Sequence, residues 1–288
     1  MLGEAVLKKN YPNRKFSPFI ETNFIKVNGI NTRYGIKGEG APILFLHGFP
    51  ENLQTWRHYF GILSDSFKTI ALDLKGFGYT DKPDCDYTLW NMVDFVKGFM
   101  DALEIEKFNL AGSDIGMAIA AAYAHKYSAH IDKLILMAGS VYGEGFLGPE
   151  VTLLSKKPLG EIIMGLSGSF GIKMGLEKGF YGKDFISEEL FKEYYTPYKE
   201  FRTKKITLDF MRSFATAKPD MSKEITNLQP DTLILWAQYE KFFTMDVAKW
   251  LNRDIKNSRL EIVPDCGHFI QEEKPLESAD IIRNFISK

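Results

Sequence analysis

The chain of 288 residues lacks the features that mark membrane, secreted and nucleic-acid-binding proteins. It has no apolar run near the ~18 residues that a membrane-spanning helix needs. Its first residues, "MLGEAVLKKNYPNRKF", contain no apolar segment of the kind found in signal peptides. The formal net charge is −1, without long runs of one sign, so a nucleic acid or an anionic membrane is not indicated as a partner. We expect a protein without a membrane anchor and without a nucleic-acid partner.

Cysteine is also scarce. The only two, Cys85 and Cys266, lie far apart in the sequence and do not show the spacing of metal ligands. We interpret both as free thiols in a reducing compartment, which predicts a cytoplasmic location and no metal site. Internal repeats and low-complexity tracts are absent as well, so a repeat architecture is excluded.

What the chain does have is an alternation of short apolar runs with helical patterns. Such alternation is typical of a parallel sheet with helices on both faces. The predicted strands are 23–28 and 32–36 (a hairpin), then 42–47, 68–73, 107–112, 133–138, 231–237 and 259–265. The predicted helices are 53–64, 88–103, 115–127 and 275–287. The fold class is therefore α/β, and the length allows one domain with a large core.

The alternation stops between residues 140 and 222, where glycines and long helical segments replace strands. We predict an α/β core formed by 1–139 and 223–288, with a helical cap, 140–222, inserted between them. The glycines of 165–179 lack the G-K-[ST] ending of a phosphate loop, so we interpret them as packing or hinge positions.

The stretch "LAGSDIGMAI" (110–119) places Asp114 in a G-x-D-x-G turn between a predicted strand and a predicted helix. This arrangement is the nucleophile elbow, in which glycines leave room around a strained central residue. The alternative is that Asp114 only caps the following helix, but an ordinary cap needs no glycine on both sides. Ser113 is out of register with the tip, and we interpret it as a spacer.

A carboxylate nucleophile restricts the substrate. Attack on an acyl carbon would give an anhydride, whereas attack on a saturated carbon that bears a leaving group gives an alkyl ester of the enzyme. Water then hydrolyses the ester at the carboxyl carbon of Asp114. The expected substrates are small apolar epoxides, alkyl halides or strained lactones. Nucleophile, base and water complete the cycle, so no cofactor is expected.

The second step needs a base. His268 lies in a turn after the last predicted strand, within "VPDCGHFIQEEKP" (263–275), and is the best candidate. A carboxylate must orient its imidazole, and Glu240, which follows the preceding strand, is our first choice. Glu144 is the second choice and Asp246 a distant third.

Backbone donors must stabilise the oxyanion of the ester intermediate. "LHGFPENLQTW" offers the Phe49 N–H after the third predicted strand, and the elbow offers the Ile115 N–H. His47 and Pro50 flank Phe49, and we place both at the substrate pocket.

The segments HGFPE, "LDLKGFGYTDKP" (72–83), G-S-D-I-G and "CGHFIQEEKP" together resemble the aspartate-nucleophile branch of the α/β-hydrolase superfamily. Epoxide hydrolases and haloalkane dehalogenases belong to that branch. The resemblance covers residues 22–140 and 231–288 well and the cap only loosely. It implies an α/β-hydrolase fold with Asp114 as nucleophile, His268 as base and Glu240 as its orienting acid.

The leaving group distinguishes the two activities. Family epoxide hydrolases protonate the leaving oxygen with cap tyrosines, whereas dehalogenases bind the halide with N–H donors. The side chains of Ile115 and Phe49 cannot donate, and 140–222 contains no Trp and no His. The candidate acids are Tyr198, Tyr142 and Tyr195.

One family tyrosine is missing, because Met211 stands at its position. Met211, Phe210 and Phe269 would instead make the pocket apolar. We therefore predict an epoxide hydrolase, monomeric or homodimeric, with a dehalogenase as the alternative. A lactone-opening enzyme of the same branch and a ligand-binding homologue without turnover are further alternatives.

Overall fold

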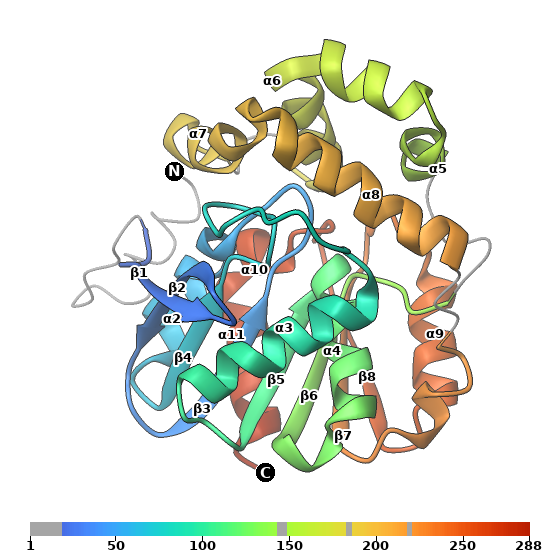
Figure 1. Ribbon diagram of the computed structural model, residues 1–288. Coiled ribbons are helices and arrows are strands. Elements are labelled where there is room, and N and C mark those ends of the chain that lie inside the picture. Colours follow the sequence, from blue (N-terminus) through green and yellow to red (C-terminus); the bar gives the residue numbers. More distant parts are fainter. Residues whose placement is uncertain (1–18, 143–148, 183–185, 218–220) are drawn as a thin grey trace.

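The computed structural model describes residues 19–142, 149–182, 186–217 and 221–288. A sheet of eight strands lies at the centre, in the order β1-β2-β4-β3-β5-β6-β7-β8 (Figure 1). Its strands are β1 (Asn23–Val27), β2 (Ile30–Lys37), β3 (Ala41–Leu46), β4 (Phe67–Leu72), β5 (Phe108–Ser113), β6 (Ile131–Met137), β7 (Asp231–Ala237) and β8 (Ser258–Val263). The β1–β2 and β2–β4 pairs are antiparallel, and the other pairs are parallel. The predicted mostly parallel sheet is confirmed.

Helices cover both faces of this sheet, because its strands are apolar on both sides. In β3, Leu44 and Leu46 join one buried cluster, and the alternating residues Ile43 and Phe45 join the other. The first face is covered by α3 (Leu89–Ala102), α4 (Ile115–Lys126) and α9 (Met245–Asp254), and the second by α2 (Arg57–Leu63) and α11 (Pro275–Ile286). Shorter helices are η1 (Leu53–Trp56), η2 (Ser128–His130), η4 (Ile225–Asn227) and α10 (Ile270–Glu273).

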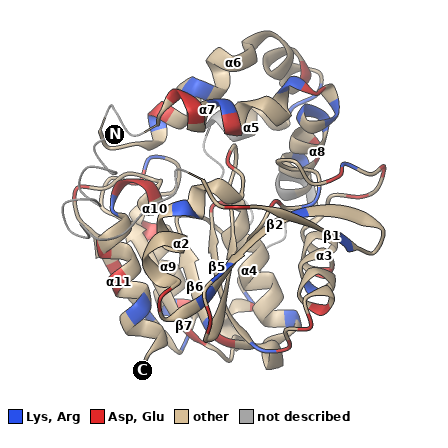
Figure 2. Ribbon diagram, turned by 90° about the vertical axis from the view of Figure 1, so that its left-hand side faces the viewer, with Lys and Arg blue, Asp and Glu red and all other residues tan. Residues whose placement is uncertain are grey.

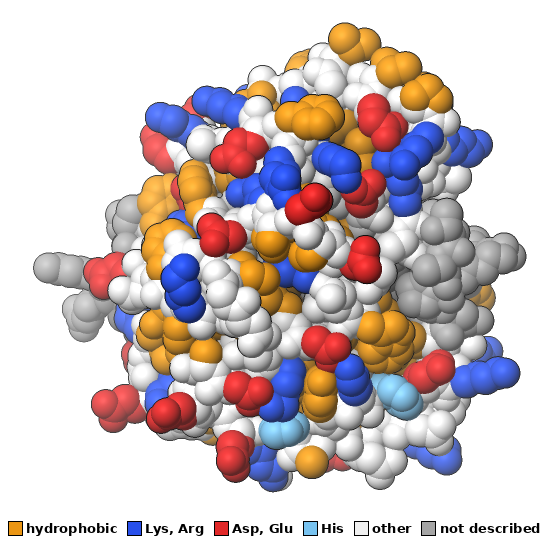
Figure 3. All heavy atoms as spheres, in the orientation of Figure 1, with side chains coloured by type: hydrophobic (Ala, Val, Ile, Leu, Met, Phe, Trp, Pro, Cys, Tyr) orange, Lys and Arg blue, Asp and Glu red, His pale blue; other side chains and the backbone are white. Residues whose placement is uncertain are grey.

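A second layer of helices lies above the sheet, as Figure 1 shows. It comprises α5 (Pro149–Ser155), α6 (Leu159–Gly179), α7 (Glu188–Tyr195), η3 (Thr196–Lys199) and α8 (Phe201–Ala217). All of them come between β6 and β7, within the predicted cap. Helix α6 bends at Gly168, which has a positive φ of 50°. The outer face of α6 carries exposed apolar side chains, including Leu166 and Phe170, and Figure 3 shows hydrophobic side chains along the top of the molecule.

Helix α7 attaches this layer to the core through polar contacts. Its acidic residues are the red segments of α7 in Figure 2. Glu193 accepts from the Arg33 guanidinium at 2.7 Å, and the Asn52 amide donates to the Glu193 backbone carbonyl. The Tyr194 hydroxyl donates to Glu272, which also forms a two-point ion pair with Arg57. Since these groups are largely buried, the pairing holds α7 in one position over the core.

The structure bears on two expectations, the absence of a membrane anchor and the free state of both cysteines. Among the described residues, no helix has both the length and the apolar character needed to cross a membrane. Cys85 is exposed, Cys266 is buried, and both are free.

Candidate active site

Asp114 lies between the end of β5 and the start of α4, with φ 55° and ψ −120°. A non-glycine residue rarely adopts a positive φ, so this backbone is strained. The turn is also tight. A Cβ atom on Gly112 would lie 2.2 Å from the Gly116 carbonyl oxygen, and one on Gly116 would lie 2.3 Å from the Leu46 carbonyl oxygen. The two flanking positions therefore require glycine, as in a nucleophile elbow.

The Asp114 carboxylate lies between two backbone donors and a histidine. Its Oδ1 accepts from the Ile115 N–H at 2.6 Å and from the Phe49 N–H at 3.1 Å. Its Oδ2 lies 3.7 Å from the His268 Nε2. One oxygen therefore occupies the site predicted to hold the oxyanion, while the other oxygen faces the imidazole.

The other side of the imidazole faces Glu240. His268 Nδ1 lies 3.0 Å from both carboxylate oxygens of Glu240, which also accepts from the Phe242 N–H at 2.7 Å. The side chains of His268 and Glu240 are each 2% exposed, whereas that of Asp114 is 14% exposed. Asp114 is thus the most accessible of the three groups.

The charges of His268 and Glu240 stabilise each other. Burial by itself lowers the pKa of His268, but the carboxylates of Glu240 and Asp114 outweigh burial and raise that pKa to about 9. Burial by itself raises the pKa of Glu240, but His268 and the N–H groups of Phe242 and Phe243 hold it below its usual value. At neutral pH the arrangement therefore favours an imidazolium paired with the Glu240 carboxylate. Burial raises the pKa of Asp114, although His268 and the N–H groups of Phe49 and Ile115 oppose the rise.

The other two candidates for the orienting acid lie elsewhere. Asp246 is an exposed residue of α9 and pairs with Lys249. Glu144 lies outside the described residues. Glu240 is the candidate that the structure brings to His268.

We predict that Glu240→Gln slows turnover by about 10²- to 10⁴-fold, because in the mechanism expected from the sequence an amide cannot stabilise the imidazolium that forms when His268 activates water. Mass spectrometry of the enzyme during turnover should show more ester than in the wild type. Glu144→Gln is the matched control, and it should keep nearly full activity. A larger loss in Glu144→Gln than in Glu240→Gln would reverse the assignment.

The three candidate tyrosines occupy different environments. The Tyr198 ring packs on Phe49 with 5.7 Å between ring centroids, and the side chain is buried. Burial raises the pKa of Tyr198, the neighbouring Thr207 hydroxyl offsets part of this rise, and the negative charge of Asp114 adds to it. The Tyr142 hydroxyl donates to Asp254 in α9, and the Tyr195 ring stacks on Phe191 of α7. The structure therefore brings Tyr198 to the site and engages Tyr142 with the core.

The predicted pocket residues divide into two groups, one beside His268 or in the cap and one in the loop after β3. Phe269 packs against His268 with 4.9 Å between ring centroids, and Phe210 and Met211 are buried residues of the cap helix α8. Pro50 is buried and follows a cis peptide bond. His47 is fully buried, with Nδ1 beside the Gly48 carbonyl and Nε2 accepting from the Leu74 N–H. Since both ring nitrogens are occupied, His47 supports the loop instead of contacting a substrate.

Glu51 is a residue to which the sequence reasoning assigns no role, although it is the last residue of HGFPE. It is buried, and its Oε1 accepts from the Thr55 hydroxyl at 2.5 Å and from the Gln271 amide at 3.1 Å. Burial raises the pKa of Glu51 to about 8, so the carboxyl is mostly neutral at pH 7. Its Oε2 has no hydrogen-bond partner among the described residues. The motif signals this residue, but its burial depends on contacts distant in sequence.

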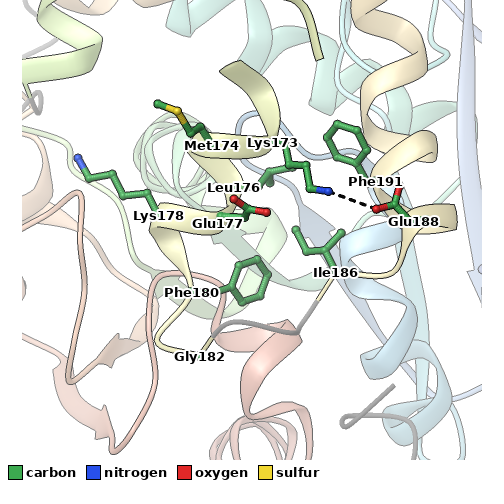
Figure 4. A pocket seen from close by; sticks show the side chains of 10 residues that line it. All are labelled: Lys173, Met174, Leu176, Glu177, Lys178, Phe180, Gly182, Ile186, Glu188 and Phe191. Atoms are coloured by element: carbon green, nitrogen blue, oxygen red, sulfur yellow. Dashed lines mark hydrogen bonds and ion pairs between the residues drawn. The ribbon is translucent and has the colours of Figure 1, made fainter. Parts of the chain in front are cut away.

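The cap also contains a separate cavity of about 530 Å³ between α6 and α7 (Figure 4). Its lining combines apolar side chains such as Leu176, Ile186 and Phe191 with the Lys173–Glu188 ion pair. Asp114, His268 and Glu240 are not among its lining residues. Within the described residues, no cluster of His, Cys, Asp and Glu could hold a metal ion.

Comparison with known families identifies the fold. The sequence pattern described as "alpha/beta hydrolase fold" matches residues 41–159 and 172–275. The chain belongs to the α/β-hydrolase family. Among solved structures of this fold, Cfl2 from Burkholderia cenocepacia superimposes with a TM-score of 0.86 at 22% identity, over 92% of this chain and 95% of the other. The predicted fold is thereby confirmed.

Curated relatives of this α/β-hydrolase include enzymes of different specificity. Epoxide hydrolase 3 of Xenopus tropicalis is 28% identical over 92% of this chain and 77% of its own. Haloalkane dehalogenase of Agrobacterium fabrum is 28% identical over 87% of this chain and 86% of its own. The 2-hydroxy-6-oxo-2,4-heptadienoate hydrolase of Pseudomonas putida is 25% identical over 91% and 95%. Membership therefore shows a hydrolase fold, and the choice of substrate depends on the site.

Proposed function

We propose that this α/β-hydrolase opens small apolar epoxides through a covalent ester on Asp114, which water activated by His268 then hydrolyses. The observation that carries the proposal is the position of the Asp114 carboxylate. Its Oδ1 accepts from two backbone N–H groups, and its Oδ2 faces the His268–Glu240 pair. An aspartate at the elbow calls for attack on a saturated carbon, because a stable ester then forms.

In the first step, Oδ2 attacks an epoxide carbon and the carbon–oxygen bond of the ring breaks. The electron pair of that bond stays on the ring oxygen, which takes a proton from the Tyr198 hydroxyl. After the ring has opened, the resulting tyrosinate takes up a proton, from the His268 imidazolium in the wild type or from solvent where that imidazolium is absent, so alkylation itself does not depend on His268. Alkylation removes the negative charge of Asp114 that helps to hold this proton, so the pKa of His268 falls at the point when a neutral base is needed.

In the second step, neutral His268 takes a proton from water and the hydroxide attacks Cγ of Asp114. The Ile115 and Phe49 N–H groups stabilise the oxyanion that develops on Oδ1. The Cγ–Oδ2 bond then breaks, and the departing oxygen takes the proton of the new Cγ hydroxyl to complete the diol. This restores the carboxylate and leaves the other proton of the water on His268. The sum of both steps is epoxide plus water to diol, with the enzyme returned to its starting charge.

Two features favour an epoxide over a halide. The Tyr198 hydroxyl is buried without a hydrogen bond of normal length to any described residue, although the Thr207 hydroxyl, which donates to the Thr203 carbonyl at 2.9 Å, lies close enough to lower the Tyr198 pKa. An unpartnered buried donor is costly unless a ligand satisfies it, as an epoxide oxygen would. In addition, the side chains of Phe49 and Ile115, beside the nucleophile, carry no N–H group for a halide.

The test is Tyr198→Phe, measured on an epoxide and on an alkyl halide of similar size. We expect epoxide opening to slow by about 10²-fold or more, because the leaving alkoxide loses its general acid. Alkylation by the halide should be unchanged, since a halide leaves without a proton. Tyr195→Phe is the matched control and should leave both rates unaffected. Fast turnover of halides alone by the wild type would instead assign a dehalogenase.

A further inference from the structure

Backbone hydrogen bonds join the end of the cap to the loop that carries His268. We call residues 179–182, at the end of α6, the cap end, and residues 265–268 the histidine loop. The His268 N–H donates to the Gly179 carbonyl at 2.7 Å. The Gly267 N–H donates to Oε1 of Glu273 at 2.9 Å, and the Tyr181 N–H donates to Oε2 at 2.9 Å. Glu273, the last residue of α10, therefore bridges the two segments.

The cap end and the histidine loop also lie too close together for a side chain at position 267. A Cβ atom on Gly267 would lie 2.3 Å from the Gly179 carbonyl oxygen and 2.6 Å from the Tyr181 nitrogen. The Phe180 ring, shown at the cap end in Figure 4, packs on Phe269 with 4.8 Å between centroids. These contacts fix the cap end against the histidine loop on both sides of His268.

Two carboxylates thus act on His268 in different ways. Glu240 contacts its imidazole, whereas Glu273 contacts the backbone before it and the cap beside it. We propose that Glu273 is a positioning residue for His268, which keeps the imidazole in place only while the cap end is joined to the histidine loop. The inference rests on the proposed function, in which His268 is the base of ester hydrolysis.

Burial raises the pKa of Glu273 to about 7, but the backbone N–H groups of Tyr181, Gly267 and Gly182 converge on this side chain and favour its ionised form. The position therefore requires two acceptor oxygens. A glutamine has a single acceptor oxygen, and its NH₂ group would face one of the two N–H donors. Glu273→Gln thus preserves size while depriving either the part-buried Gly267 N–H or the exposed Tyr181 N–H of its acceptor. We call the contacts between the cap end and the histidine loop the joint. Asp114 and its two N–H donors lie outside the joint, so the rate of ester formation serves as an internal reference.

The experiment measures the two steps separately, by quenching the reaction with an epoxide at short times and weighing the intact protein. In Glu273→Gln we expect ester hydrolysis to slow about tenfold, while ester formation stays within about twofold of the wild type. A structural defect would slow both steps and lower Tm together. Equal slowing of both steps, or no change in hydrolysis, would overturn the proposal. Glu277→Gln, an exposed glutamate of α11, is the surface control.

Variants at Tyr181 test the cap side of the joint. Tyr181→Pro removes the N–H group, and the preceding Phe180 has φ −78° and ψ 145°, which a following proline permits. Tyr181→Ala keeps the N–H group but loses the ring, which stacks on Tyr239 at 4.5 Å. We expect the proline variant to slow hydrolysis as Glu273→Gln does, with little further loss in the double variant. Equal slowing in the alanine variant would assign the effect to the ring stack and overturn the role of Glu273.

A readout without substrate separates this inference from the proposed function. Hydrogen exchange of the Gly267 and Tyr181 amides should accelerate in Glu273→Gln, and the ring resonances of His268 should shift. If the wild type and His268→Gln form no ester with any electrophile, the proposed function fails, but these measurements still report on the joint. Unchanged exchange together with unshifted His268 resonances would overturn the positioning role itself.

Discussion

Asp114→Asn is expected to abolish turnover, with a loss on the order of 10⁴-fold or more, because the amide cannot act as the attacking group. The variant should fold normally. Asparagine tolerates a positive φ, as Asp114 requires, and its amide oxygen can still accept from the Ile115 and Phe49 N–H groups. The measurement is the rate of diol formation with the epoxide that the wild type turns over best, together with the intact mass of the variant.

Ser113→Ala is the matched control for the nucleophile. Ser113 precedes Asp114 and is buried, and its hydroxyl has no hydrogen-bond partner among the described residues. Replacing an unpartnered hydroxyl by hydrogen should preserve most of the activity, whereas a serine-type hydrolase using Ser113 would be inactivated. Near-normal activity in Asp114→Asn, with its mass showing no reversion to aspartate, would eliminate the covalent mechanism.

The core of the fold could be predicted because its signals are local. The eight predicted strands match β1 to β8 with ends that differ by at most two residues. The parallel strands are recognisable because buried parallel strands are short apolar runs between turn residues. Helix α9, however, comes from a region to which the sequence reasoning assigns no element. Its buried residues Val247, Ala248 and Leu251 make only one short apolar stripe, and the tertiary contacts decide its structure.

The arrangement of Asp114, His268 and Glu240 could be anticipated because each follows the carboxyl end of a strand, and parallel strands bring those ends to one edge. Side-chain partners could not be anticipated in the same way. Tyr142 falls within the predicted cap range, yet its hydroxyl reaches Asp254, which is 112 residues away. His47 belongs to the same motif as Phe49, yet its partner is the backbone of Leu74.

The contacts of Glu273 could not be predicted from the sequence either, although this residue lies in a recognisable motif. The segment CGHFIQEEKP contains it, and the sequence reasoning assigns a role only to its histidine and phenylalanine. The role of the carboxylate depends on Tyr181, which is 92 residues away, at the end of a cap helix. A motif can therefore locate such a residue without indicating which of its neighbours in space it contacts.

His268→Gln is expected to stop the reaction after its first step. Oδ2 of Asp114 can still attack, because the oxygen and its neighbouring N–H donors are unchanged, but no base remains to activate water. Loss of a general base slows the affected step by about 10²- to 10⁴-fold. The ester should therefore accumulate until it accounts for nearly all of the enzyme, and digestion should map the added mass to the peptide that contains Asp114.

The mass of this adduct also decides between the two leading substrates. Epoxide opening adds the whole mass of the substrate, because the leaving oxygen stays attached to the carbon skeleton. Halide displacement adds the alkyl group without the halogen. The reference is the double variant Asp114→Asn with His268→Gln, which should gain no mass from either compound. An adduct in that double variant would mean that another nucleophile reacts, and the assignment of Asp114 would fail even if the single variant became labelled.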